Sequence, residues 1–292
     1  KQLFWLFLGV VVMMICLMRG YKFFLNTSYL FFGATLALLF AVWAVGSERM
    51  GAQRWLEIGA FQLQPSELSK LATILMLAKF LGNRKVGQYQ FMTVVAAFGL
   101  VLVPLVFILK QPDLGTALIF VPILFCMLFI WGSKLRYFLI PFLMAVASMP
   151  LFWSMLREYQ KRRLLVFINP NIDPLGSGYT AIQSKIAVGS GQFFGKGWTQ
   201  GTQNKLAFLP EHHTDFIFSV VGEEWGFVGS LVVIGLFIIL LWRAIEMLHL
   251  TTDSSAKLLG VGIISMFFFH VLINIGMTVG MMPITGLPLP FI

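Results

Sequence analysis

Eight apolar stretches of the chain are long enough, or nearly so, to cross a bilayer as a helix, which takes about 20 residues. They lie at residues 2–18, 29–45, 65–81, 91–109, 114–131, 135–154, 214–242 and 258–282. Tryptophans fall near the ends of several stretches, at Trp43, Trp131, Trp153 and Trp242, where interfacial aromatic residues are expected. The pattern predicts an all-α fold, a polytopic transmembrane helix bundle with about eight spans present.

The composition agrees with a membrane location. Of the 292 residues, 58% are hydrophobic and 11% are charged, whereas soluble domains carry about 25% charged residues. A soluble fold cannot hide so much apolar surface, so lipid must cover part of it. Cys16 and Cys126 lie inside apolar stretches and are typical of packing residues, and the histidines and cysteines lack the spacing of metal ligands. We expect no metal site made by these residues.

The positive charges predict the orientation of the spans. The formal net charge is +9, and the loops after the first, third, fifth and seventh stretches carry Arg19, Lys22, Lys79, Arg84, Lys85, Lys134, Arg136, Arg243 and Lys257. The opposite short loops carry Arg49, Arg54 and Lys110. Because cytoplasmic loops are enriched in Lys and Arg, we expect the first set to be cytoplasmic. Both chain ends would then lie outside, so we expect residues 1–292 to be a single membrane domain truncated at both ends.

Residues 155–213 form a large extracytoplasmic loop in this orientation, mostly polar and rich in glycine. Its many basic residues run against the charge bias that sets the orientation. An anionic partner outside the cell, either lipid head groups or a phosphorylated substrate, would explain them. The alternative is a solvated loop whose charges only contact lipid phosphate. Apolar stretches at residues 164–168 and 193–194 predict short helices that lie on the membrane.

Asp215 lies where this loop re-enters the membrane, in the segment LPEHHTDFIF at residues 209–218. Thr214 or Asp215 can cap the following helix, which is worth about 1 kcal/mol. Alternatively, Asp215 lies at the mouth of a cavity, where a carboxylate can take a proton from a sugar hydroxyl. Glu223 and Glu224 follow about 12–14 Å further along the same helix, and a structural pair with a basic residue is the favoured interpretation for them.

Glu67 and Lys70 are three residues apart in a helix that begins at Pro65, so their side chains can touch on one face. They form either a self-neutralising pair that aids packing or a pair that lines a substrate cavity, with Lys70 exchanging its partner for a phosphate. Asp113 is interpreted as a helix cap that follows Pro112. His270 and Asn274, four residues apart, predict interhelical hydrogen bonds.

Taken together, several segments resemble the SEDS family (shape, elongation, division and sporulation proteins). They are RWL at 54–56, QPSELSK at 64–70, KQPDLGT at 110–116, QSKIAVGSG at 183–191, GKG at 195–197, GTQ at 201–203, residues 209–218 with GEE at 222–224, and PITGLPLPF at 283–291. The resemblance covers essentially the whole chain in order. Residues 213–216 and 282–286 look more like the elongation members than the division members. The family has ten spans with both termini cytoplasmic, so this chain lacks the first and stops before the last.

The resemblance implies a peptidoglycan glycosyltransferase, which polymerises lipid II into β-1,4-linked glycan strands outside the membrane. Asp215 matches the family's catalytic carboxylate, and Glu67 and Lys70 match its cavity pair. We hypothesise that Asp215 is the general base and that the displacement inverts C1. Basic loop residues, Lys196 and Lys205, would stabilise the departing pyrophosphate, and Gln203 and His213 are further candidates for substrate binding. No organic cofactor is expected, and a divalent cation could share the role of the lysines.

Two other functions stay open, a flippase or transporter of lipid II and a non-catalytic scaffold of the wall-synthesis complex. The enzyme is favoured because the polar residues cluster at the expected outer face, with no matching inner set. The resemblance implies lipid II, membrane lipids and a class B penicillin-binding protein (a transpeptidase) as partners, and no nucleic acid. The expected location is the bacterial cytoplasmic (inner) membrane.

Overall fold

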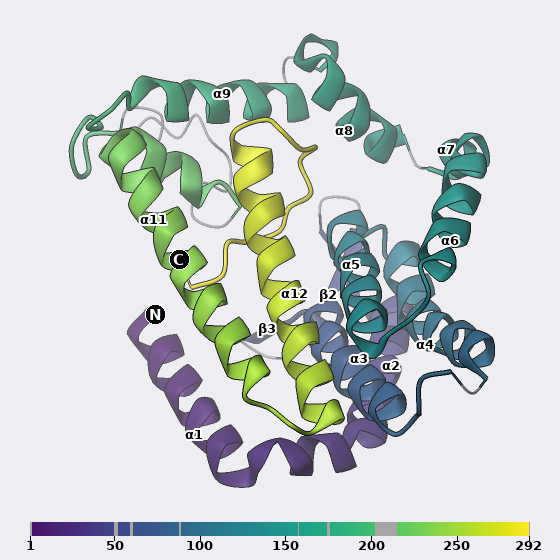
Figure 1. The fold of residues 1–292 in the computed structure, drawn as a ribbon. Helices are drawn as coiled ribbons and strands as arrows, with labels where there is room; N and C mark the ends of the chain where they lie inside the picture. The colour runs from purple at the N-terminus through teal and green to yellow at the C-terminus, as the bar shows by residue number, and fades with distance from the viewer. Residues whose placement is uncertain are drawn as a thin grey trace. The chain divides into compact units, whose positions relative to one another are not determined.

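The computed structural model describes residues 2–49, 52–58, 61–87, 89–156, 158–173, 176–201 and 215–291. The chain forms two compact units. The first unit comprises residues 1–113, 120–134 and 248–263, and the second comprises residues 114–119, 135–247 and 264–292. Most described elements are helices (Figure 1), and the fold is the all-α membrane bundle that the apolar pattern predicts.

The first unit is built around α3 (Pro65–Gly82). It packs against α1 (Gln2–Asn26), α2 (Ser28–Val45) and α4 (Gln90–Lys110). Proline at the first helical position begins α3, because its missing N–H would have no partner there. The unit is completed by parts of α5 (Leu114–Trp131) and α12 (Ser254–Thr278).

A small antiparallel sheet follows α2, where the sequence predicted only a short connection. Its strands are β1 (Ser47–Arg49), β2 (Ala52–Ile58) and β3 (Phe61–Leu63), in the order β1-β2-β3. Strand β2 packs against α2 and α3. Strands this short leave little periodic signal, and a search for apolar stretches long enough to span a bilayer overlooks them.

The second unit contains α6 (Arg136–Ala147), α7 (Met149–Met155), α8 (Glu158–Ile168), a short 3-10 helix η1 (Pro170–Ile172), α9 (Ser177–Ser190) and α11 (Ile217–His249). Figure 1 shows α9 lying across the ends of α11 and α12. The hydroxyl of Ser184 in α9 lies 2.7 Å from that of Ser219 in α11 and donates to the carbonyl of Thr278 in α12, also at 2.7 Å. One buried serine thus ties three helices together.

Six of the described helices are long and apolar enough to cross a membrane: α1, α2, α4, α5, α11 and α12. The predicted count of eight spans differs at two places. The stretch at 65–81 forms α3, a helix of sufficient length that carries Glu67, Lys70 and Lys79. The stretch at 135–154 is divided at Ser148 into α6 and α7, and Pro150 in the first turn of α7 favours that division.

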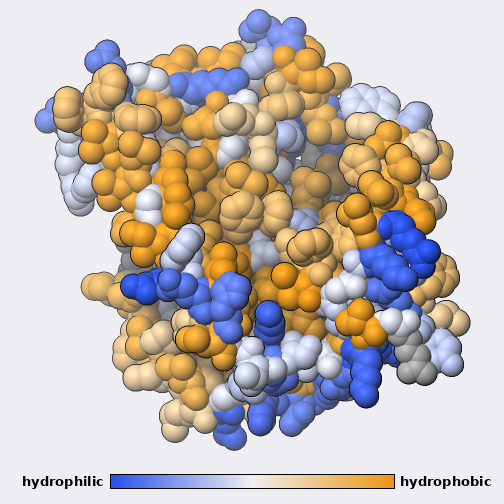
Figure 2. Space-filling model, in the orientation of Figure 1, coloured by the Kyte–Doolittle hydropathy of each residue, from blue (hydrophilic) through white to orange (hydrophobic). Residues whose placement is uncertain are grey.

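Much of the visible surface is apolar (Figure 2). Large hydrophobic side chains such as Leu6 and Phe7 in α1, and Leu236 and Ile239 in α11, are more than half exposed. Soluble monomers rarely expose contiguous apolar patches larger than a few hundred Å². The hydrocarbon core of a bilayer is the solvent that suits these faces.

The large loop predicted at 155–213 contains a high proportion of helix in its described part, namely α8, η1 and α9. The prediction of a short helix is confirmed for residues 164–168, which lie within α8. It is wrong for Phe193 and Phe194, which lie in turns after α9. The positive φ angles of Gly195 and Gly197 there are incompatible with a helix.

Candidate functional site

Asp215 lies in the turn directly before α11 and is partly exposed. Its Oδ2 would be 3.3 Å from a Cβ placed on Gly286, so the carboxylate faces the segment after α12. The amide of Asn274, in α12, donates to the backbone carbonyls of Asp215 at 2.9 Å and Leu287 at 2.7 Å. Asn274 was predicted to bond between helices, and its partners are in fact backbone atoms that flank the carboxylate.

Two basic side chains lie along the same segment after α12. Arg163 of α8 donates to the carbonyl of Ile284 at 3.5 Å. Lys185 of α9 packs against Gly280, where a Cβ would overlap its Cε. Together with Met282 they line a small pocket. Since Gly286 of this segment faces Asp215, the arrangement gathers two cations and the carboxylate around one stretch of chain.

Lys196 and Glu223 form an ion pair in the second unit, with Nζ 2.7 Å from Oε1. The Glu223 side chain is 1% exposed and that of Lys196 is 29% exposed. Its ammonium lies against this buried carboxylate, and the expected contact of Lys196 with pyrophosphate stays a prediction. The basic partner that the sequence predicted for Glu223 or Glu224 is therefore identified for Glu223.

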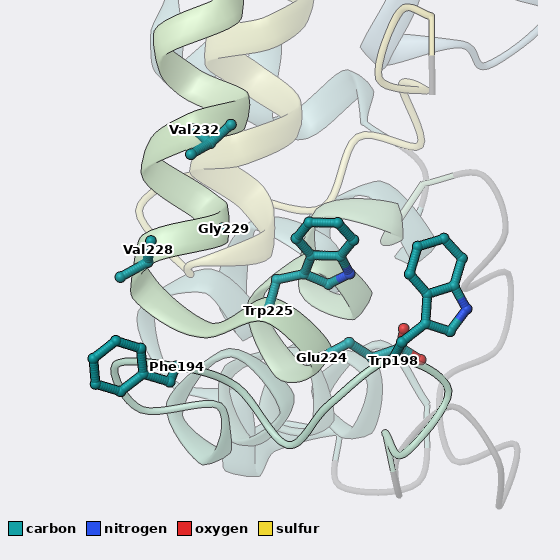
Figure 3. A pocket seen from close by; sticks show the side chains of 7 residues that line it. All are labelled: Phe194, Trp198, Glu224, Trp225, Val228, Gly229 and Val232. Carbon is teal, nitrogen blue, oxygen red and sulfur yellow. The ribbon is translucent and has the colours of Figure 1, made fainter.

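An apolar pocket of about 320 Å³ lies beside α11 in the second unit (Figure 3). The rings of Trp198 and Trp225 lie 5.7 Å apart at its edge. The lining residues are Phe194, Trp198, Glu224, Trp225, Val228, Gly229 and Val232. Exposed tryptophans next to valines are typical of the boundary between lipid head groups and hydrocarbon.

Glu67 and Lys70 meet as their spacing predicts, with Nζ 2.8 Å from Oε1 on α3 of the first unit. The Lys70 side chain is 1% exposed and that of Glu67 is 40% exposed. The lysine is therefore the buried member of the pair, and the carboxylate is the member that an approaching molecule can reach.

The sequence missed a polar cluster near this pair. The carboxylate of Asp113 lies 3.9 Å from the guanidinium of Arg54 and accepts a hydrogen bond from Gln64 at 3.3 Å. Arg54 also donates to the carbonyls of Gln111 and Pro112. Each of three motifs, RWL, QPSELSK and KQPDLGT, supplies a member, so their joint resemblance to one family was the available signal.

An apolar groove of about 560 Å³ also belongs to the first unit. Side chains from α1, α2, α3 and the start of α12 line it, among them Leu17, Phe31, Leu71 and Leu259. Such a surface suits a hydrocarbon chain from the bilayer.

Three of the predicted substrate-binding residues, Gln203, Lys205 and His213, lie outside the described residues. Of the others, Glu67 and Lys70 belong to the first unit, whereas Asp215 and Lys196 belong to the second. Within the described ranges no group of three or more His, Cys, Asp or Glu side chains could hold a metal ion. The divalent cation stays an untested expectation.

Comparisons with known proteins place these residues in context. The sequence model of a family described as "Cell cycle protein", which comprises FtsW, RodA and SpoVE, matches residues 1–292. The peptidoglycan glycosyltransferase MrdB of Escherichia coli K12 is 40% identical over 258 residues, which cover 88% of this chain and 70% of that protein. The peptidoglycan glycosyltransferase RodA of Treponema pallidum is 33% identical over an alignment of 361 positions, gaps included, that covers 99% of this chain and 83% of that protein.

A solved structure matches as well, under the description "Structural coordination of polymerization and crosslinking by a peptidoglycan synthase complex". The TM-score is 0.80 and the sequence identity is 33%, and the match covers 97% of this chain and 80% of that one. The agreement therefore extends along nearly the whole chain in both sequence and fold.

Proposed function

The chain belongs to the FtsW/RodA/SpoVE family, and on that premise we propose that it polymerises lipid II into β-1,4-linked glycan strands during cell elongation, with Asp215 as general base. It is a peptidoglycan glycosyltransferase and a multi-pass protein of the bacterial inner membrane. The proposal adds the substrate, the reacting residue and the place of the reaction, the outer face of that membrane.

The observation that carries the proposal is the setting of Asp215. The carboxylate is partly exposed, and its backbone is held in place by Asn274. A general base needs both properties, because it must reach the acceptor hydroxyl and must keep a fixed direction toward it. Asp215 takes the proton from the 4-hydroxyl of the acceptor sugar. At the same time, the oxygen of that hydroxyl bonds to C1 of the donor. The bond from C1 to the diphosphate oxygen breaks, and C1 is inverted.

The leaving diphosphate gains negative charge as that bond breaks, so cations close to it lower the barrier. Arg163 and Lys185 support this step, because both lie along the segment that faces Asp215. They were not singled out from the sequence, where they were two among many basic residues of the loop. Lys205 remains a predicted contributor.

Glu67 and Lys70 remain proposed substrate-binding residues in the first unit, with the exposed Glu67 carboxylate as the accessible group. The solved relative is described as part of a complex that coordinates polymerization and crosslinking. By analogy we propose that this chain acts with a class B penicillin-binding protein, the transpeptidase that crosslinks its product.

The test is polymer formation from purified lipid II by the full-length protein. Replacement of Asp215 by Asn keeps the shape of the side chain and removes the base, so the rate should fall about 10²-fold or more. Asp253→Asn is the matched control, since Asp253 is an acid that bonds the exposed Tyr21 hydroxyl and lies outside the proposed site. Normal polymerisation by the Asp215→Asn protein would refute the catalytic assignment.

A vesicle assay separates the other functions. Wild-type protein that moves lipid II across the bilayer but forms no polymer would favour a transporter. Protein that does neither, yet restores polymerisation when a second wall enzyme is added, would favour a scaffold.

A further inference from the structure

Helix α11 is broken at Gly226, where the backbone angles are φ 66° and ψ −158°. In an unbroken helix the N–H groups of Phe227 and Val228 would donate to the carbonyls of Glu223 and Glu224. The break separates these two donor–acceptor pairs. Backbone N–H and C=O groups that lose their helical partners need other partners in a membrane protein.

The segment after α9 provides partners for the two carbonyls. The N–H of Lys196 donates to the carbonyl of Glu223, and the N–H of Gly197 donates to that of Glu224, both at 3.0 Å. These two N–H groups replace the donors that Phe227 and Val228 would supply in a continuous helix.

The same segment also provides partners for the two N–H groups. Phe227 donates to the carbonyl of Gln192 at 2.8 Å, and Val228 donates to that of Phe193 at 3.1 Å. Residues 192–197 are thus spliced into α11 by four backbone hydrogen bonds, in place of the two that a continuous helix would make. We refer to residues 192–197 in this position as the splice.

Glycines make the close approach feasible. A Cβ on Gly195 would meet the carbonyl oxygen of Glu224, and one on Gly191 would meet that of Gly222. A Cβ on Gly226 would meet the backbone of Phe193 at 2.8 Å. The backbones of the splice and of α11 therefore touch directly, which leaves no room for larger residues.

The ion pair joins the same two segments, the splice and helix α11. Lys196 contacts Glu223 twice, through its backbone N–H at 3.0 Å and through its ammonium at 2.7 Å. A buried carboxylate favours a nearby cation strongly, because it has lost its contact with water. The charge of Lys196 is directed at α11 and serves to hold the splice in place.

We propose that Lys196 and Glu223 are positioning residues for the glycosyl transfer, whose ion pair clamps the splice into the break of α11 and so fixes Asp215. The part of α11 before the break, from Ile217 to Trp225, begins two residues after Asp215. One end of this part is held by Asn274 through the Asp215 carbonyl, and the other end is held by the clamp. This inference rests on the proposed function of Asp215.

The decisive experiment is a double-mutant comparison with full-length protein and purified lipid II. Lys196→Met and Glu223→Gln should each lower kcat about tenfold or more and change KM for lipid II by less than about threefold, because coupled buried partners show large interaction effects. The double variant Lys196→Met/Glu223→Gln should regain part of the lost rate, because it leaves no uncompensated charge and keeps the four backbone hydrogen bonds of the splice, but it should stay below wild type because the ion pair is gone. Lys196→Arg, which keeps the charge, should stay within about threefold of wild type.

A different pattern would overturn the clamp. If Lys196 binds the diphosphate of lipid II, Lys196→Met raises KM, and the added Glu223→Gln change rescues nothing. If a single variant does not fold, the double variant and Lys196→Arg still decide, since the clamp requires Lys196→Arg to be close to wild type and the double variant to be intermediate. The activity of these variants is measured as polymer formation, and this measurement does not depend on which carboxylate is the base. The Asp215→Asn experiment therefore tests the proposed function separately.

A glycine pair tests the splice without touching a charge. Gly191→Ala, at the residue that directly precedes the splice, places a methyl group against the Gly222 carbonyl and pushes the start of the splice away from α11, so it should lower kcat about tenfold or more. Gly189→Ala, two residues earlier at the end of α9, meets nothing within 4 Å and should stay within about twofold of wild type. Equal activity of the two variants would show that the contact between splice and helix is dispensable.

Discussion

Each unit contains a Lys–Glu ion pair with one buried member, and the two pairs are built in opposite ways. In the first unit the lysine, Lys70, is buried and its partner Glu67 reaches the surface. In the second unit the carboxylate, Glu223, is buried and its partner Lys196 is partly exposed. Glu67 and Lys70 are three residues apart on one helix, whereas Lys196 and Glu223 are 27 residues apart.

The difference separates a local pair from a tertiary one. A pair at i and i+3 forms wherever its helix forms, so it neutralises charge but joins no two elements. A pair between a loop and a helix fixes their relative position. The first pair therefore leaves an accessible carboxylate for binding, and the second pair holds structure together.

The largest expected effect concerns the tertiary pair. Lys196→Met leaves the Glu223 carboxylate buried without its cation, so the free energy of unfolding should fall by about 3 kcal/mol. Glu223→Gln leaves a lysine that water can reach, and it should lower the same quantity by about half as much or less. Denaturant unfolding of the detergent-solubilised protein measures both. Equal losses would mean that burial does not distinguish the partners.

For the Glu67–Lys70 pair, replacement of the carboxylate should lower the free energy of unfolding more than replacement of the lysine, and both losses should be smaller than that of Lys196→Met. Glu67→Gln removes the carboxylate that accepts the hydrogen bond of the buried Lys70 ammonium, and we expect a loss of about 2 kcal/mol in the free energy of unfolding. Lys70→Met replaces the buried charge by an apolar chain of similar length and should change stability by less than about 1 kcal/mol.

The polymerisation rate provides a second test of the Glu67–Lys70 pair. Because Glu67 is the accessible group of the proposed substrate-binding pair and Lys70 holds its carboxylate, the Lys70→Met protein should polymerise lipid II poorly although it unfolds normally. A Lys70→Met protein that is stable and fully active would show that the pair serves packing alone.

The smallest expected effect concerns neutral hydrogen bonds of the same two kinds. Ser184→Ala removes the hydroxyl that contacts both α11 and α12, so it should cost about 1 kcal/mol of stability. Ser190→Ala, in the same helix, removes a bond only to the carbonyl of Ala187, and its effect should be less than half as large. Thermal unfolding of the two variants, followed side by side, gives the answer. A greater loss from Ser190→Ala would contradict the distinction between local and tertiary contacts.

Much of the fold could be predicted because apolar stretches map directly onto helices. The stretch at 114–131 coincides with α5, and that at 29–45 differs from α2 by one residue. The break in α11 could not be predicted in this way. An isolated glycine such as Gly226 is tolerated inside helices, and it becomes a break only because a remote segment supplies replacement hydrogen bonds.

In the candidate site, too, contacts within one short segment could be predicted from the sequence, and contacts between remote segments could not. Asp215 and the Glu67–Lys70 contact followed from position and spacing within one short segment. The pairing of Lys196 with Glu223, and the gathering of Arg163 and Lys185 beside the segment after α12, depend on how α8, α9 and α11 fold together. A list of basic residues in a loop does not say which of them lie against a carboxylate and which lie along the segment that faces Asp215.

The break in α11 also limits how far changes after Gly226 alter the position of the part before it. In a continuous helix, a single inserted residue rotates everything on one side of it by about 100° relative to the other side. Here the piece that follows Asp215 is held by Asn274 and by the splice, and the remainder is tied to the splice through Phe227 and Val228, so residues beyond Val228 do not set the direction of the first piece through helical hydrogen bonds. Insertions, deletions or altered lipid contacts in that remainder can therefore accumulate while the aim of the proposed base stays the same.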